Sequence, residues 1–447
     1  MSDNIISDEL KLKAAQKPNI DILFVSDGDS RLYPIRGEST IKSFVRFYDR
    51  ITDTSYYTTQ SKKLVTITDA ELAGINVLWL DNLMDFNAAR NLSTVIERII
   101  TSIVPEWRET LKELNDTDKD AATAYIAELD LKRKSKLRII YALDEFVWDA
   151  PIGRSREVNR VQIIESMMGL ADSIVVPNAD LRDFITHFGV VREGSDIHVI
   201  PSALSVDFVQ LYRNFNRVGV SSVLSEKPRI LIKGIEIPEN VQEFIMDNYK
   251  KMNITICSVG EVNQHVMGLI QGKKVNHIMH WAHPHVTRNN IIDTYAIERD
   301  MGFDVTIHTK PSVLNERYYE LTCGDDDILF SIAAGSIPVC GTEHIGYSED
   351  HLSYISGYVF GPDAPAKYLR GVIDSVVKVP VKFNEVYNKC HAALEHRVAA
   401  APEIMNLYYQ VMIGKELSDA RKALASEVKE LLNEKQEQTV NEGSENV

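Results

Sequence analysis

Short runs of apolar residues, many of them rich in β-branched side chains, recur along this chain and usually end at an Asp, Asn, Pro or Gly. Examples are IDILFVS at 20–26, INVLWL at 75–80 and LRIIYAL at 137–143. Between such runs, apolar residues recur three and four positions apart, as they do around 88–103 and 158–170. The first pattern is typical of buried parallel strands and the second of amphipathic helices. Their alternation predicts an α/β fold in which helices cover both faces of a parallel sheet.

The alternation stops and then restarts, which predicts two domains. The segment 212–228 loses the pattern, and it resumes with a strand-like run at 229–232. A chain of 447 residues also fits two hydrophobic cores better than one. We therefore expect two tandem Rossmann-like domains followed by C-terminal helices. The expected bounds are 1–215 and 216–385 for the domains, 386–433 for the helices and 434–447 for a disordered tail.

The segment 105–136 differs from its surroundings because charged residues dominate it. Acidic residues come first, and the segment ends in Lys132, Arg133, Lys134 and Lys136. We expect an exposed helical excursion from the first domain. The basic run is more typical of a solvated helix end than of a ligand site.

Composition excludes several classes of protein. The hydrophobic content of 44% argues against a wholly disordered chain, and no run approaches the roughly 18 apolar residues that span a bilayer. The four cysteines are far apart, so neither a zinc knuckle nor a disulfide framework is indicated. The net charge of −15 works against non-specific binding to nucleic acid or anionic membrane, although a local basic groove could survive it. The N-terminus has no signal-peptide pattern, and we expect a cytoplasmic protein.

Three segments share a pattern with a known group of enzymes. The segment 171–208 has Ala-Asp before a strand, Asn178 at a helix start, Pro201 after a strand and then Val-Asp-Phe. The segment 141–151 reads YALDEFVWDAP, and 303–341 has a strand, a proline loop, an Asn, a charged helix, and a small-residue AxG before a PV strand. In this order they resemble the GT-B-fold, nucleotide-sugar-dependent glycosyltransferases, in particular the retaining, glycogen-synthase-like group. The resemblance covers most of the chain.

The resemblance implies an enzyme that moves a sugar from a nucleotide-sugar donor to a hydroxyl acceptor in an interdomain cleft. The donor would bind mainly to the second domain and the acceptor, which is a glycan, a protein or a nucleic acid, to the first. This architecture requires no cofactor and no metal. Retention of configuration is the expected outcome.

The candidate site residues follow strands, because ligands of open α/β sheets bind beyond the carboxyl ends of the strands. A positive group near the departing diphosphate stabilises its charge, and a carboxylate near the acceptor can orient or deprotonate a hydroxyl. The donor-binding candidates are Lys233, Gly234, Asn315, Arg317, Glu320, Asp327 and Thr342; the catalytic candidates are Asp144 and Glu145; and the acceptor-side candidates are Asp27, Gly28 and Arg36.

Each candidate also has an ordinary structural interpretation. Lys233 fits a solvated lysine at a strand end, and Asn315 fits a turn or cap residue. Asp144 and Glu145 fit an N-cap or a salt bridge to a nearby arginine.

The donor segment departs from the family pattern at two positions. The family has a Glu five residues before the glycine of AxG, and here that position is Phe330; its earlier acidic residue falls at Thr322. The neighbouring acids Glu320 and 325–327 would substitute if the helix were shifted in register.

A histidine-rich segment, NHIMHWAHPH at 276–285, allows two interpretations. Its spacing could bring two or three imidazoles together on a metal, but strand-end residues beside the ligand are favoured.

Two other functions stay open at this point. One is a non-catalytic GT-B-like structural or binding protein, which the missing donor-site Glu favours. The other is a glycosyltransferase that acts on modified DNA bases, against which the net charge argues.

Overall fold

The computed structural model describes residues 16, 19–26, 53–81, 83, 87–143, 145–149, 158–187, 191, 196–201, 227–234, 237–258, 263–277, 298–309, 318–322, 326–341, 356–361, 364–414, 417–420, 423 and 426. The segment 40–48, whose apolar residues at three- and four-residue spacing also predict a helix, lies outside these residues. Most of the predicted connection 212–228 and the predicted tail lie outside them as well.

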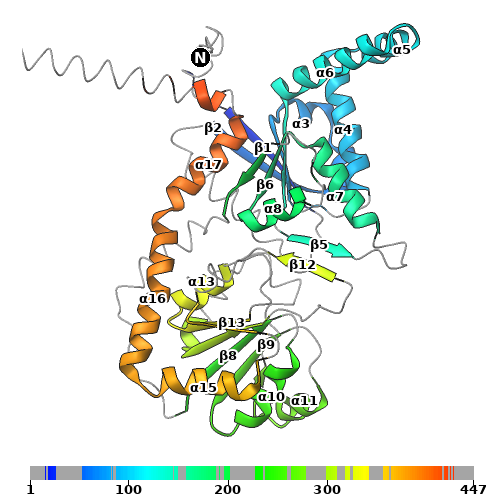
Figure 1. Ribbon diagram of the computed structural model, residues 1–447. Helices are drawn as coiled ribbons and strands as arrows, with labels where there is room; N and C mark the ends of the chain where they lie inside the picture. Colours follow the sequence, from blue (N-terminus) through cyan, green and yellow to red (C-terminus); the bar gives the residue numbers. More distant parts are fainter. Residues whose placement is uncertain are drawn as a thin grey trace, which may run out of the picture.

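The first half of the chain forms a six-stranded parallel sheet in the order β2-β1-β3-β4-β6-β7 (Figure 1). Its strands are β1 (Asn19–Ser26), β2 (Asp53–Gln60), β3 (Val77–Asp81), β4 (Arg138–Ala142), β6 (Ser173–Val176) and β7 (Ile197–Val199). The helical elements of this half are η1 (Ser61–Thr66), α3 (Asp69–Ala73), α4 (Ala88–Ile103), α5 (Trp107–Thr117), α6 (Lys119–Lys136), α7 (Val158–Leu170) and α8 (Ala179–His187). Alternate strand residues point to opposite faces, so Leu23 and Val25 share a buried cluster with α4 and α7.

The second half forms another six-stranded parallel sheet, in the order β10-β9-β8-β11-β13-β14. Its strands are β8 (Arg229–Gly234), β9 (Asn253–Ser258), β10 (Asn276–His277), β11 (Val305–His308), β13 (Ile337–Gly341) and β14 (Tyr358–Phe360). Its helices are α10 (Glu239–Asn248), α11 (Gln264–Gln271), α13 (Asp326–Ala333), α15 (Ala366–Val377) and α16 (Pro380–Ala399). Helices α10, α11 and α15 bury one face of this sheet, and α13 and α16 bury the other. The predicted α/β class with two tandem Rossmann-like domains is confirmed.

A two-stranded antiparallel ribbon lies between the two sheets (Figure 1). It consists of β5 (Glu145–Asp149), which follows β4, and β12 (Tyr318–Thr322), which follows β11. Each ribbon strand therefore comes after the carboxyl end of a strand of its own sheet. The resemblance predicts a charged helix after Asn315, whereas the chain forms strand β12 there before α13 begins.

The C-terminal helices connect the two halves. Helix α16 packs on the second sheet through residues such as Phe383 and Leu394. The next helix, α17 (Ala401–Ile413), packs on the first sheet, where Tyr408 lies 5.6 Å from the ring of Trp79. Helix α17 therefore returns to the first half and covers the face of its sheet opposite α4. The exact domain limits stay predictions.

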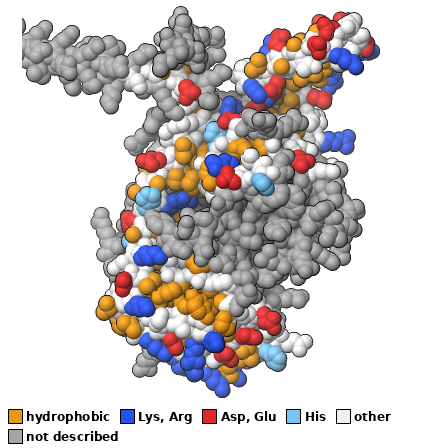
Figure 2. All heavy atoms as spheres, viewed as in Figure 1, with side chains coloured by type: hydrophobic (Ala, Val, Ile, Leu, Met, Phe, Trp, Pro, Cys, Tyr) orange, Lys and Arg blue, Asp and Glu red, His pale blue; other side chains and the backbone are white. Residues whose placement is uncertain are grey.

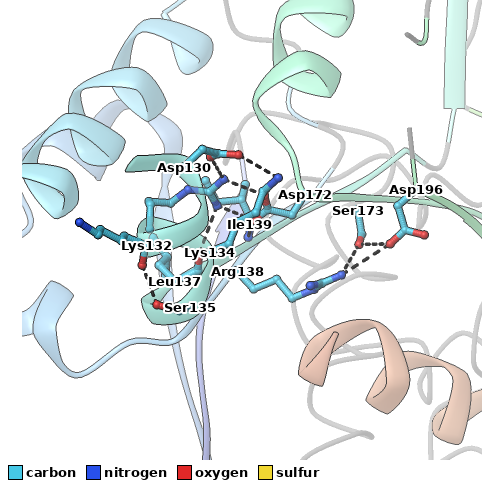
Figure 3. Close-up of polar contacts among 11 residues, drawn as sticks. Asp130, Lys132, Lys134, Ser135, Leu137, Arg138, Ile139, Asp172, Ser173 and Asp196 are labelled. Atoms are coloured by element: carbon cyan, nitrogen blue, oxygen red, sulfur yellow. Dashed lines mark hydrogen bonds and ion pairs between the residues drawn. The ribbon is translucent and has the colours of Figure 1, made fainter. Parts of the chain in front are cut away.

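Helices α5 and α6 form the predicted excursion and extend away from the first sheet (Figure 1). Arg133, near the end of α6, is only 2% exposed. Its guanidinium donates two hydrogen bonds to the buried carboxylate of Asp172 and one to Asp130 (Figure 3). The expectation of a solvated basic helix end is therefore wrong for Arg133, while Lys132 and Lys134 are exposed and paired with acidic residues of the same helix.

In the part of the chain that the structure describes, no helix combines the length and the apolar character needed to cross a bilayer.

Candidate functional site

The strand order of the second sheet marks the first place to look for a ligand site. When the six strands are numbered by their order in the chain, their order across the sheet is 3-2-1-4-5-6. This is the strand order of dinucleotide-binding Rossmann domains. The order reverses between β8 and β11, so the connections that follow these two strands leave in opposite directions. A crevice forms at such a switch point, beyond the carboxyl ends of the strands, and ligands of open α/β sheets bind there.

Two of the polar residues at the ends of β8 and β11 are register partners. Lys233 lies opposite His308, and both side chains are buried, at 5% and 3% exposure. Thr309, the residue after β11, binds the carbonyl of Lys233 through its backbone N–H at 2.7 Å and its hydroxyl at 3.2 Å. These bonds hold the two strands together at the point where their connections separate.

The ammonium of Lys233 forms a buried ion pair. Its Nζ lies 2.5 Å from Oε1 of Glu298, whose side chain is also 5% exposed. The hydroxyl of Ser331, on α13, donates to the other carboxylate oxygen of Glu298 at 3.0 Å. Burying either charge alone would cost much free energy. The ion pair and the hydrogen bond from Ser331 compensate the loss of water around the two charges.

The sequence of β8, RILIKG, explains why a lysine is tolerated in this interior. Ile230 and Ile232 point into the cluster beneath α10 and α15, whereas Leu231 and Lys233 point to the other face. The aliphatic part of Lys233 shares this face with Leu231, and its ammonium contacts the buried carboxylate of Glu298. The interpretation of Lys233 as a solvated lysine is therefore wrong, and its role in donor binding stays a prediction.

The other donor-binding candidates are placed only in part. Gly234 is the last residue of β8, Glu320 lies in the middle of β12, and Asp327 is the second residue of α13. The side chains of Glu320 and Asp327 are not among those that the structure describes. Asn315, Arg317 and Thr342 lie outside the described residues altogether.

The two departures from the family pattern have clear positions. Phe330 is 4% exposed and packs between α13 and α16, in the cluster that contains Tyr387 and Leu394. Its side chain fills the core of the domain, so this turn of α13 supplies no acid there. Thr322 ends β12 and pairs with Glu145 across the ribbon. Because Glu320 lies in the same strand, a shift of helix register does not bring it onto α13.

The first sheet has its own switch point, between β1 and β3. Asp81, the last residue of β3, is 7% exposed at this carboxyl edge. The catalytic candidate Glu145 is the first residue of β5, and its side chain is not described. The catalytic candidate Asp144 and the acceptor-side candidates Asp27, Gly28 and Arg36 lie outside the described residues.

The described residues contain no group of three or more His, Cys, Asp or Glu side chains that could hold a metal ion. His277 ends β10, and the other histidines of the segment 276–285 lie outside these residues.

Glu298 and Ser331 are the site residues that the sequence did not single out. Glu298 lies 65 residues from Lys233 and Ser331 lies 33 residues further on. The only local signal is a carboxylate in the segment 290–300, which the sequence predicts to be a helix that precedes a strand. Nothing in that pattern identifies the lysine with which it pairs.

Comparison with protein-family models and with curated proteins finds no match. Among solved structures, the chain is similar to HepE from Anabaena in complex with UDP, with 11% identity over 92% of this chain and 100% of that chain and a TM-score of 0.46. It is also similar to an α,α-trehalose-phosphate synthase (UDP-forming) from Burkholderia vietnamiensis, with 8% identity, the same coverage and a TM-score of 0.45. A glycosyltransferase from Rickettsia africae ESF-5 shares 12% identity over 89% of this chain and 98% of that chain, with a TM-score of 0.42. At these values the fold assignment rests on the strand orders of the two sheets.

Proposed function

We propose that this protein is a glycosyltransferase that moves a sugar from a nucleotide-sugar donor to a hydroxyl acceptor. The observation that carries the proposal is the Rossmann strand order of the second sheet, whose switch point lies between β8 and β11. The nucleotide diphosphate binds beyond the carboxyl ends of these strands. The acceptor binds on the side of the first sheet, toward which the β5–β12 ribbon extends.

The chemistry needs a positive charge close to the departing diphosphate. The bond between the sugar's anomeric carbon and the diphosphate breaks, its electron pair stays on the phosphate oxygen, and the acceptor oxygen bonds to the same carbon. The acceptor's proton passes to a carboxylate, for which Asp144 and Glu145 are the candidates. Lys233 is the candidate for the positive charge.

The buried pair sets a condition on this role. Glu298 already holds the ammonium of Lys233, so a bound diphosphate must draw it away from that carboxylate or share it. Glu298→Gln removes the competing charge while it keeps an oxygen for Ser331. If Lys233 binds the diphosphate, Glu298→Gln should not weaken nucleotide binding. Replacement of Lys233 by a residue without an ammonium should weaken it.

Isothermal titration with UDP, GDP, TDP and their sugars tests the proposal. UDP and UDP-glucose come first, because solved structures of HepE contain them. Charge-assisted hydrogen bonds contribute about 1.5–3 kcal/mol, so loss of the ammonium weakens binding about 10- to 100-fold. Lys233→Ala leaves Glu298 buried and unpaired, so the double variant Lys233→Met/Glu298→Met keeps the interior neutral and is the better test.

Lys112→Ala, on the exposed surface of α5, is the matched control, and thermal unfolding of every variant verifies the fold. Failure of the wild-type protein to bind or hydrolyse any nucleotide sugar refutes the proposed glycosyltransferase activity. Unchanged affinity in the double variant refutes only the role of Lys233.

The second candidate function is a non-catalytic binding protein with the same fold. The buried Phe330 favours it, since this position holds no carboxylate for a donor ribose. A protein of this kind binds the nucleotide without turnover. Prolonged incubation with a radiolabelled nucleotide sugar, followed by separation of free sugar and nucleotide, distinguishes binding alone from hydrolysis or transfer.

A further inference from the structure

The amino-end face of the second sheet, opposite the candidate site, carries a cluster of lysines. Helices α10 and α11 run antiparallel to their strands and therefore end at this face. The turns after them hold Lys250, Lys251, Lys273 and Lys274, all exposed, which we call the lysine cluster. Figure 2 shows Lys and Arg side chains gathered at the end of the molecule where Figure 1 places α10, α11 and α15.

A single aromatic ring brings the two turns together. The Nζ of Lys250 lies 5.7 Å from the centroid of the Tyr249 ring, and the Nζ of Lys274 lies 5.9 Å from it. Both distances are within the range of a cation–π contact. The four charges therefore form one surface patch.

The lysines of the cluster differ in ion pairing from other lysines of the chain. Other lysines, such as Lys132 and Lys378, form ion pairs with acids one turn away on their helices. Within the described residues, no ion pair joins any lysine of the cluster to a carboxylate. This concentration of positive charge stands out in a chain whose net charge is −15.

Lys273 occupies a strained backbone conformation. Its φ is +52°, in the left-handed region, and it follows Gly272 at the end of α11. Glycine adopts this conformation with no steric cost, whereas the Cβ of any other residue destabilises it. A lysine at this position places a charge on the surface but makes the fold less stable than a glycine would.

Exposed apolar side chains lie on the same face. Met301 precedes β11 and is 38% exposed, and Val379 and Val381, between α15 and the first turn of α16, are 47% and 77% exposed. Figure 2 shows hydrophobic side chains at the corner where α15 meets α16. The face thus combines flexible positive charges at one side with aliphatic tips at the other.

We propose that this face docks the protein on the surface of an anionic lipid bilayer. Lysines are point charges on flexible stems and bind a headgroup layer without fixed geometry. Aliphatic tips gain free energy in the interfacial region of a bilayer, whereas a nucleic-acid site would favour arginine and open aromatic platforms. The candidate site at the carboxyl edge then faces away from the bilayer.

Co-sedimentation with vesicles tests the proposal. Wild-type protein is mixed with vesicles of phosphatidylcholine alone or of phosphatidylcholine with phosphatidylglycerol, at low and at high salt. We expect binding only to the anionic vesicles, weakened by salt. At roughly 1 kcal/mol per lysine, a variant with Lys250→Ala, Lys251→Ala, Lys273→Ala and Lys274→Ala loses roughly 1,000-fold in partition coefficient. Val379→Ser with Val381→Ser reduces the binding that remains at high salt.

The control variant removes four exposed lysines from the first half, Lys62, Lys63, Lys112 and Lys119, each replaced by Ala. It changes the net charge equally and should keep its vesicle binding within a few-fold. An equal loss in both variants, or equal binding of the wild type to neutral and anionic vesicles, overturns the proposal. Tighter binding to duplex DNA than to vesicles, lost in the lysine-cluster variant, also overturns it and identifies a nucleic acid as the partner.

Discussion

Replacing Arg133 by Met should destabilise the first half of the protein strongly. The guanidinium donates to both carboxylate oxygens of Asp172, to Asp130 at 2.5 Å and to the carbonyl of Leu137 at 3.2 Å (Figure 3). Both side chains of the central pair are 3% exposed. Without the arginine, the carboxylate of Asp172 stays buried, with the backbone N–H of Ile139 as a hydrogen-bond donor and the ammonium of Lys134 3.7 Å away. Removing one partner of such a pair costs about 3–5 kcal/mol.

Urea unfolding, followed by circular dichroism, measures this loss. With a slope of roughly 2 kcal/mol per molar urea, the transition of the first half should move down by about 2 M. Adding Asp172→Asn to Arg133→Met should recover a large part of the loss, because no charge is then left buried. Arg108→Ala is the control, since its pair with Glu97 is 63% and 50% exposed and such surface pairs contribute at most about 1 kcal/mol. A loss in Arg133→Met no larger than that of Arg108→Ala would refute this reasoning.

The remaining predictions concern Asp196, two glycines and Lys273. The hydrogen bond from His198, with those from Ser173 and the charge of Arg138, lowers the pKa of Asp196 to about 2 against the effect of burial. Asp196 therefore stabilises the fold above about pH 4, and this contribution is lost as the pH falls toward 2; the difference in urea midpoint between wild type and Asp196→Asn should shrink over that range. Gly357→Ala should destabilise the protein by roughly 1–3 kcal/mol, because the added Cβ would lie 2.5 Å from a side-chain carbon of β13. Gly371→Ala, where the Cβ meets open space on α15, should stabilise the protein by roughly 0.5–1 kcal/mol. Thermal unfolding measures both changes. Lys273→Gly removes a steric cost of roughly 1–2 kcal/mol but adds roughly 0.5–1 kcal/mol of unfolded-state entropy, so stability in urea unfolding should rise by roughly 0.5–1 kcal/mol. Binding of this variant to anionic vesicles should fall.

Much of the fold could be predicted from local sequence patterns. The apolar runs at β1, β4 and β6 and the helical spacing of α4 and α7 correspond to the observed elements, because burial on both faces leaves a continuous apolar strand and burial on one face leaves a helical stripe. Strand β2 was missed, since DTSYYTTQ is polar and lies at the edge of its sheet. Strands β5 and β12 were missed because each forms only by pairing with the other, more than a hundred residues away.

The candidate site divides in the same way. A lysine at the end of β8 is visible in the sequence, and strand alternation assigns the face to which it points. Its burial is not visible, because that depends on Glu298 and Ser331, which reach it from two other elements. The same holds for Arg133, whose place in a basic run suggested a solvated helix end, whereas Asp172 draws it into the interior.

The sequence by itself determined the class of the fold, the presence of two Rossmann-like halves and most of the elements within them. These properties follow from periodicities of two and of 3.6 residues, which each segment carries in its own side chains. Tertiary structure alone decided the strand orders, the return of α17 to the first sheet, the ion pair of Lys233 and Glu298, and the gathering of lysines at the amino-end face. Each of these joins segments that are far apart along the chain. Their free energy comes from burial and charge compensation between segments, which no local pattern encodes.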